Sequence, residues 1–168
     1  MMDFIPDDHD DLTIPYFEDA SSSLGIVGHS TNRSERELKV EIERAMGHLG
    51  ASVTLFQAGK FADRFGYRIE FLWGGSKGRI DVAALPIRKE TEGRISQAKR
   101  HALYSVMNRL ESQFNSQLVM PGDVPLVPYM MDNKGRTMIE AMREEGRLPA
   151  LPSPSPDIVE GDWREGED

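Results

Sequence analysis

Apolar residues recur at helical spacing in the first ordered stretch of the chain. Residues 35–49 carry them three or four positions apart, which places them on one helix face: Leu38, Ile42, Ala45, Met46 and Leu49. Ser34 and Glu37 form a capping box, in which each side chain can accept a hydrogen bond from the other residue's amide. The pattern predicts a helix over 35–49, and Gly50 is placed to end it.

A second and longer helix is predicted over 95–117. Its apolar stripe consists of Ile95, Ala98, Ala102, Leu103, Val106, Leu110 and Phe114. Downstream, Thr137 and Glu140 form another capping box, which predicts a short helix ending near Gly146. Between the helix at 95–117 and this short helix, residues 121–133 read as an irregular connection that could hold a short strand at 126–131.

Strict alternation of apolar and polar residues between the two long helices predicts a β-hairpin over 67–85, preceded by a short strand at 53–57. A two-residue turn at Gly75-Ser76 suits type II′, which has glycine at its first position. That register places Phe71 opposite Ile80 and Glu70 opposite Asp81. Tyr67, Ile69 and Phe71 then share the core face. Pro86 cannot donate to the ladder and ends the second strand.

This order of elements predicts an α+β fold, in which two helices pack on a small antiparallel sheet. We expect a single α+β domain at 34–147 and an acidic N-terminal segment at 1–33. Residues 148–168 should form a proline-rich linker and an acidic, disordered tail. The N-terminal segment can be read as a solvated tail that docks locally, as a partner-binding segment, or as a mimic that competes with nucleic acid.

Charge is distributed unevenly along the 168 residues. The net charge of −8 by itself argues against a polyanion partner. However, residues 1–29 have a net charge of −7 and residues 148–168 a net charge of −5, whereas residues 30–147 carry 19 basic and 15 acidic side chains. Within 60–109 there are 11 basic and 5 acidic residues. The chain therefore reads as a basic body between two acidic ends, which could screen the surface that the body offers.

Other features of the composition narrow the class of protein. The absence of cysteine excludes disulfides and thiolate zinc sites. No apolar run approaches the roughly 20 residues of a membrane span, so we expect a cytoplasmic protein with no membrane partner. The four histidines have no recognised ligand spacing, and no catalytic triad or phosphate-binding loop is present. The sequence predicts no cofactor and no resident metal, and it leaves the oligomeric state open.

Residues 60–109 combine basic and aromatic side chains, which is typical of proteins that bind single-stranded nucleic acid. Cations track the phosphates, and bases stack on aromatic faces. Trp73, Phe61 and Phe65 are the candidate stacking residues, since the remaining aromatics fall on the core face. The candidate nucleic-acid-binding residues are Lys60, Arg64, Trp73, Lys77, Arg79, Arg88, Lys89, Lys99 and Arg100.

A metal-dependent nuclease is one alternative. If Glu70 faces Asp81, the two carboxylates could bind Mg²⁺ with a third acid from the first helix, Glu41 or Glu43. Gly78-Arg-Ile-Asp81 loosely resembles the PD-(D/E)xK nucleases, although the sequence that follows, Leu85-Pro-Ile-Arg-Lys89, lacks the acid that this family has on its next strand. The simpler interpretation is a solvated mixed-charge face on which Arg68 and Arg79 neutralise both acids.

The layout of a basic body, a proline-rich linker and an acidic end resembles that of single-stranded-DNA-binding proteins. A hairpin followed by a long helix resembles the single-strand annealing proteins of phage recombination systems, and residues 97–152 look like uncharacterised phage and prophage proteins. These resemblances favour a non-catalytic nucleic-acid-binding factor in phage or mobile-element replication or recombination. The competing class is a small phage-type protein that inhibits a host protein through its acidic segments.

Overall fold

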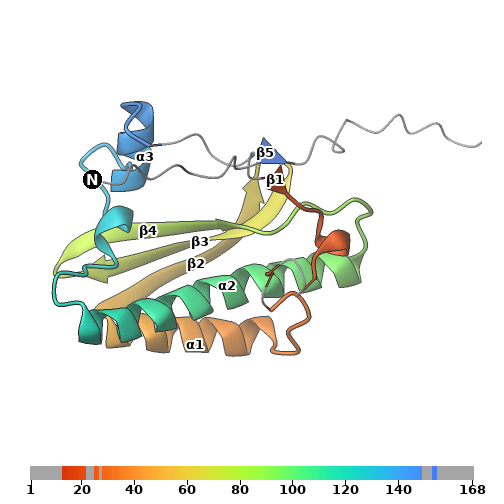
Figure 1. Ribbon diagram of the computed structural model, residues 1–168, viewed down its shortest axis with the longest axis horizontal. Coiled ribbons are helices and arrows are strands. Elements are labelled where there is room, and N and C mark those ends of the chain that lie inside the picture. Colours follow the sequence, from red (N-terminus) through yellow and green to blue (C-terminus); the bar gives the residue numbers. More distant parts are fainter. Residues whose placement is uncertain (1–12, 22–24, 27, 149–152, 155–168) are drawn as a thin grey trace, which may run out of the picture.

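The computed structural model describes residues 13–21, 25–26, 28–148 and 153–154. Two helices pack on one face of a three-stranded antiparallel sheet, which confirms the predicted α+β class (Figure 1). Within the described ranges, no helix has the length and apolar composition required to cross a membrane. The main elements are α1 (Glu35–His48), β2 (Ala51–Phe61), β3 (Arg64–Trp73), β4 (Ser76–Ala83), α2 (Glu92–Val119) and α3 (Met138–Glu144).

Both predicted capping boxes are present. The Ser34 hydroxyl accepts a hydrogen bond from the Glu37 amide at 3.2 Å, and the Glu37 carboxylate accepts one from the Ser34 amide at 2.7 Å. Thr137 and Glu140 repeat this arrangement at the start of α3. The long helix α2 begins earlier than predicted, at Glu92, because Thr91 caps it through the Arg94 amide.

The sheet has the order β2-β3-β4, and its strands are longer than the sequence predicted. The short strand at 53–57 is in fact part of the 11-residue β2. Likewise, β3 begins at Arg64 instead of residue 67. Glycines at 59 and 66 interrupt the alternation of side chains, yet they lie directly opposite each other and continue the ladder.

The predicted hairpin register is wrong, because the turn is Gly74-Gly75. Both glycines have a positive φ, +56° and +79°, as a type I′ turn requires at its two central residues. The pairing on β4 consequently shifts by two residues, so Glu70 lies opposite Arg79 and Asp81 lies opposite Arg68. A shift of two preserves the faces, and the predicted core residues Tyr67, Ile69 and Phe71 are therefore still buried.

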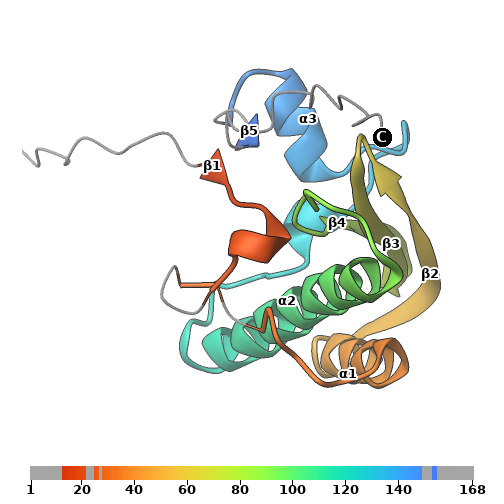
Figure 2. The same cartoon turned by 90° about the vertical axis from the view of Figure 1, so that its right-hand side faces the viewer.

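The core lies between the sheet and the two long helices. Leu38 and Ile42 of α1 and Leu103 and Leu110 of α2 are almost fully buried, together with the inner face of β3. Phe71 packs directly on Gly78, where an added Cβ would lie 2.2 Å from the ring. Figure 2 shows the helices α1 and α2 on one side of the sheet and α3 beyond β4 on the other side.

The predicted strand at 126–131 is instead a 3-10 helix, Val127–Tyr129, and it is followed by a single bridge between Met130 and Gly78. Pro125 and Pro128 lack amide hydrogens, which limits ladder pairing in this segment. This segment and α3 cover part of the outer sheet face along β4, while the outer face of β2 and β3 carries exposed Leu55 and Leu72.

Part of the acidic N-terminal segment lies on the body. The 3-10 helix Phe17–Asp19 is anchored by the Phe17 amide, which donates to the Pro86 carbonyl at 2.8 Å, and the Phe17 side chain is buried. Just before it, β1 (Thr13–Ile14) pairs in parallel with β5 (Ser153–Pro154). The predicted disordered tail at 148–168 otherwise falls largely outside the described residues, as do residues 1–12.

Candidate nucleic-acid interface

The structure distributes the nine predicted binding residues over two ends of the sheet. Trp73 and Lys77 flank the β3–β4 turn, whereas Lys60 and Arg64 flank the β2–β3 turn at the opposite end. The ten residues of β3 separate the two ends by about 30 Å. The predicted residues therefore do not form one continuous patch.

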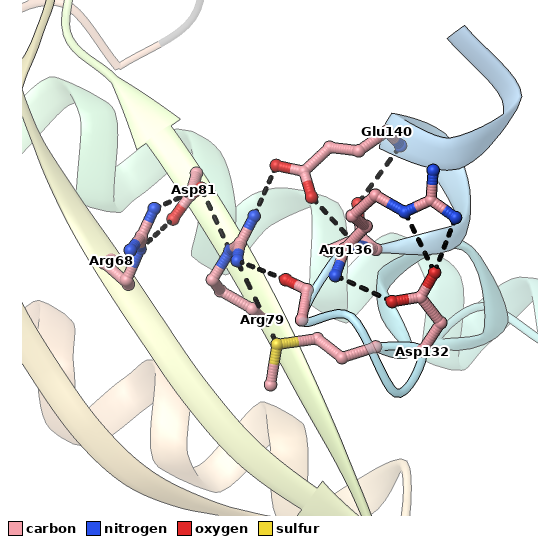
Figure 3. A network of polar contacts seen from close by, with 9 residues as sticks. Arg68, Arg79, Asp81, Asp132, Arg136 and Glu140 are labelled. Carbon is pink, nitrogen blue, oxygen red and sulfur yellow. Dashed lines mark hydrogen bonds and ion pairs between the residues drawn. The ribbon is translucent and has the colours of Figure 1, made fainter. Parts of the chain in front are cut away.

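Three of the predicted arginines are engaged in contacts within the protein. Arg64 donates from Nε to the Ala84 carbonyl at 2.7 Å, and burial lowers the pKa of its guanidinium. Arg79 has a side chain only 12% exposed, and it donates to Asp81 and Glu140 in the network of Figure 3. These two arginines hold the fold together and are not free to meet a phosphate.

The third arginine, Arg88, meets the acidic N-terminal segment. Its guanidinium donates to Asp19 at 2.8 Å and lies 4.4 Å from the centroid of the Tyr16 ring. The amides of Arg88 and Lys89 both donate to the carboxylate of Glu18 at 3.1 Å. Two acids of the N-terminal segment thus occupy this part of the predicted interface, although the Lys89 side chain is itself exposed.

Trp73 and Arg100 are also poorly placed to contact a ligand at the surface. Trp73 packs against the core cluster beneath the helices, with its indole beside Gly50. The Nε atom of Arg100 is buried without a hydrogen-bond partner among the described residues. Lys77 is exposed, but it lies at the sheet end remote from the other exposed candidates.

Three lysines from three separate elements converge over two aromatic rings. Lys39 of α1 and Lys99 of α2 place their ammonium groups 5.3 and 5.8 Å from the centroid of the Tyr67 ring. Lys60 of β2 lies 4.4 Å from the centroid of Phe65, two residues from Tyr67 on the same strand face. We call Lys39, Lys60 and Lys99 the lysine cluster.

The lysine cluster is positively charged. None of its three ammonium groups forms an ion pair with a carboxylate in the described part of the chain. Glu35 lies nearby and accepts a hydrogen bond from the Tyr67 hydroxyl at 2.6 Å. Burial, followed by this hydrogen bond, raises the pKa of Tyr67, so the phenol stays neutral and adds no negative charge.

Lys60 and Lys99 belong to the predicted set, whereas Lys39 does not. Lys39 lies off the apolar stripe of α1, and a lysine beside such a stripe normally points to water. The sequence does show that Lys39 comes directly after the buried Leu38. At this position its aliphatic chain can pack along the apolar face, and its ammonium group lies over Phe56 and Tyr67.

Two of the three candidate stacking residues, Phe61 and Phe65, lie at this same end of the sheet, on opposite faces. Phe65 is on the inner face, in a core cluster with Ala84 and Ala98 and beneath Lys60. Phe61 is on the outer face, where its ring lies over Gly66 and remains partly exposed. Phe61 is therefore the one of the three predicted stacking residues that presents a ring outside the core packing.

The metal site proposed for a nuclease loses its basis in this register. Glu70 and Asp81 do not face each other, and Asp81 is bound by Arg68 and Arg79. In the part of the chain that the structure describes, no three His, Asp or Glu side chains are close enough together to hold a metal ion. The outer face agrees with the mixed-charge interpretation, since arginines neutralise Asp81.

Searches against protein-family models, curated proteins and solved structures found no match to the chain.

Proposed function

We propose that this protein binds single-stranded nucleic acid without catalysis, and that the lysine cluster holds the phosphates of the strand. The observation that carries the proposal is the convergence of Lys39, Lys60 and Lys99, which come from three elements and have no carboxylate partner among the residues that the structure describes. Bringing like charges together is unfavourable unless an anion is bound or the charges are solvated, and a phosphate chain supplies repeated anions.

A single strand fits this end of the molecule better than a duplex. Phe61 presents part of its ring at the same end of the sheet as the cluster, on the opposite face, and an aromatic ring can stack only on a base that is unpaired and accessible.

The acidic ends suggest how this binding is regulated. Glu18 and Asp19 already bind the segment around Arg88, close in sequence to the start of α2. The C-terminal segment 148–168 carries a further net charge of −5. Under this proposal both ends compete with phosphates for the basic body and so lower non-specific binding.

Fluorescence anisotropy with a short labelled oligothymidylate tests the proposal across a salt series. The triple variant Lys39→Gln, Lys60→Gln and Lys99→Gln keeps a polar side chain with two methylenes at each position while three charges are lost. We expect the affinity to fall and the salt slope to decrease by about 2, because each phosphate contact contributes about 0.7 to the slope for single strands. Lys134→Gln, on an exposed turn, is the matched control.

A second arm concerns the acidic end. Replacing the six acids of 157–168 by their amides in the full-length chain should tighten binding, since it removes charge that competes with phosphate. The proposal is wrong if the wild-type protein does not bind any strand at low salt. It is equally wrong if the triple variant binds with the salt slope of the wild type. In either case, capture of a host protein through the acidic segments becomes the leading hypothesis.

A further inference from the structure

The outer face of the sheet contains a small pocket at the end that carries the lysine cluster. It has a volume of about 250 Å³ and is lined by Gln57, Ala58, Gly59, Lys60, Phe61 and Arg68. Because side chains alternate along a strand, Gln57, Gly59 and Phe61 share the outer face of β2. Their partners across the ladder are Arg68, Gly66 and Arg64 in turn.

Gly59 forms the floor of this pocket. Gly59 and Gly66 are directly opposite each other, so neither strand contributes a side chain at this level of the sheet. A Cβ added at Gly59 would meet no atom within 4 Å and would project into open space. At Gly66, by contrast, a Cβ would lie 2.9 Å from the Phe61 ring, which shows that the ring leans over the floor from one side.

The opposite wall is polar. Gln57 and Arg68 form a cross-strand pair, which offers an amide with donor and acceptor capacity beside a guanidinium. Arg68 is fixed in place because Asp81 accepts two hydrogen bonds from it, at 2.9 and 3.1 Å. Its side chain nevertheless remains 40% exposed and can approach a ligand. The pocket thus combines one aromatic wall, one hydrogen-bonding wall and a flat floor.

We infer that this pocket binds one base of the single strand, stacked on Phe61 and hydrogen-bonded by Gln57 or Arg68. The inference rests on the proposed function and assigns the base-binding part of the same interface. A flat heteroaromatic ring with donors and acceptors on its edge matches an aromatic wall, a flat floor and an amide–guanidinium pair.

Lys60 connects this pocket with the lysine cluster. It precedes Phe61 in β2, and its ammonium lies over Phe65 on the inner face while Phe61 occupies the outer face. A strand that crosses the end of the sheet therefore meets a cation and an aromatic ring on adjacent residues. This arrangement places a phosphate at Lys60 and the attached base in the pocket.

Gly59→Val tests the pocket without removing any charge. The φ of Gly59 is not in the left-handed region and the added Cβ has open space, so the variant should fold, while its side chain fills the floor. Ser52→Val is the matched control, because Ser52 is exposed on the same strand and lies opposite Leu72, at the far end of the sheet. Thermal unfolding of both variants verifies that they are folded.

Two labelled strands separate base recognition from phosphate recognition: oligothymidylate, and an abasic strand with the same number of phosphates. We expect Gly59→Val to weaken oligothymidylate binding about tenfold, within the fivefold to hundredfold range of one stacked base, and to leave abasic binding unchanged. Phe61→Leu, which keeps an apolar side chain over Gly66, should have the same effect. Ser52→Val should alter neither strand.

The possible failures are distinguishable. If Gly59→Val and Phe61→Leu bind oligothymidylate as the wild type does, the base pocket is wrong, while the lysine cluster stands as long as its triple variant loses binding. If the wild type binds the abasic strand as tightly as oligothymidylate, the base pocket is again overturned. If the wild type binds neither strand, the proposed function and the pocket are both overturned.

Discussion

Arg68 and Asp81 lie directly opposite each other on β3 and β4, and the guanidinium donates two hydrogen bonds to the carboxylate (Figure 3). Hydrogen bonding to the Asp81 carboxylate raises the pKa of Arg68 above its ordinary value. Asp81 also accepts from Nε of Arg79 at 3.1 Å. One carboxylate therefore orients two arginines: one directed toward the pocket, the other toward α3.

Asp81→Asn should destabilise the protein by about 1 kcal/mol, because Arg68 is partly exposed and exposed ion pairs contribute 0.2–1 kcal/mol each. The more enclosed Arg79 adds to the loss. Urea unfolding at low and high salt measures the effect, which should shrink as salt screens the charges. Glu43→Gln, an exposed carboxylate on α1, is the control and should change stability by less than half as much. Equal losses in both variants would contradict a specific role for Asp81.

Arg79 connects α3 and the loop before it to the sheet. Its side chain donates to Asp81, to Glu140 of α3 and to the Gly135 carbonyl at 3.0 Å, and only 12% of it is exposed. Arg79→Ala removes the arginine partner of Glu140 and one of the two arginines that bind Asp81, so we expect a loss of about 2–3 kcal/mol. Hydrogen exchange should accelerate mainly in α3. Arg143→Ala, at an exposed position of the same helix, should leave exchange unchanged. If hydrogen exchange accelerated equally across the whole sheet, Arg79 would not act specifically on the attachment of α3.

The faces of the sheet could be predicted from the sequence, while the register could not. Alternation alone decides which side chains of 67–73 are buried, and a shift of two residues leaves that assignment intact. The register depends on which two residues of Gly74-Gly75-Ser76 form the turn. Glycine at the first position allows II′ or I′, and the positive φ of both glycines decides for I′. This turn places Glu70 opposite Arg79 instead of Asp81, so a repulsive cross-strand pair is replaced by an attractive one.

The candidate site was only partly predictable for a different reason. Lys60 and Lys99 were identified by charge, but their convergence with Lys39 depends on how α1 and α2 cross the sheet. Arg79 and Arg88 resembled surface cations because their partners lie 61 and 69 residues away in the sequence. Composition gives the number of cations in a segment, whereas only the tertiary structure shows which of them are already paired.

Acid should weaken the attachment of the N-terminal segment. Burial tends to raise the pKa of Glu18, but the amides of Lys89 and Arg88 outweigh it and hold that pKa below the ordinary 4.5. A carboxylate with a lowered folded-state pKa contributes stability that is fully present above the unfolded-state pKa and is lost as the pH falls through the folded-state pKa. Glu18→Gln should therefore destabilise the protein by about 1–2 kcal/mol at neutral pH.

The difference between Glu18→Gln and the wild type should shrink as the pH falls below 4.5, the ordinary pKa of glutamate, and through the lower pKa of Glu18 in the folded protein. Thermal unfolding between pH 3 and pH 7 measures this, with the exposed Glu90→Gln as control. A difference between Glu18→Gln and the wild type that stays constant over the whole range would contradict an ionised Glu18 in this contact.

The surroundings of two glycines lead to opposite predictions for their replacement by alanine. At Gly78 an added Cβ would lie 2.2 Å from the Phe71 ring, which is 1% exposed and cannot move aside into solvent. Gly78→Ala should therefore cost about 1–3 kcal/mol, as overpacking of a core does. At Gly47, on the exposed face of α1, a Cβ meets nothing within 4 Å, so Gly47→Ala should stabilise the helix by about 0.5–1 kcal/mol. Urea unfolding of the two variants measures both effects. A Gly78→Ala variant as stable as the wild type would contradict the close packing of Phe71 on Gly78 that this register produces.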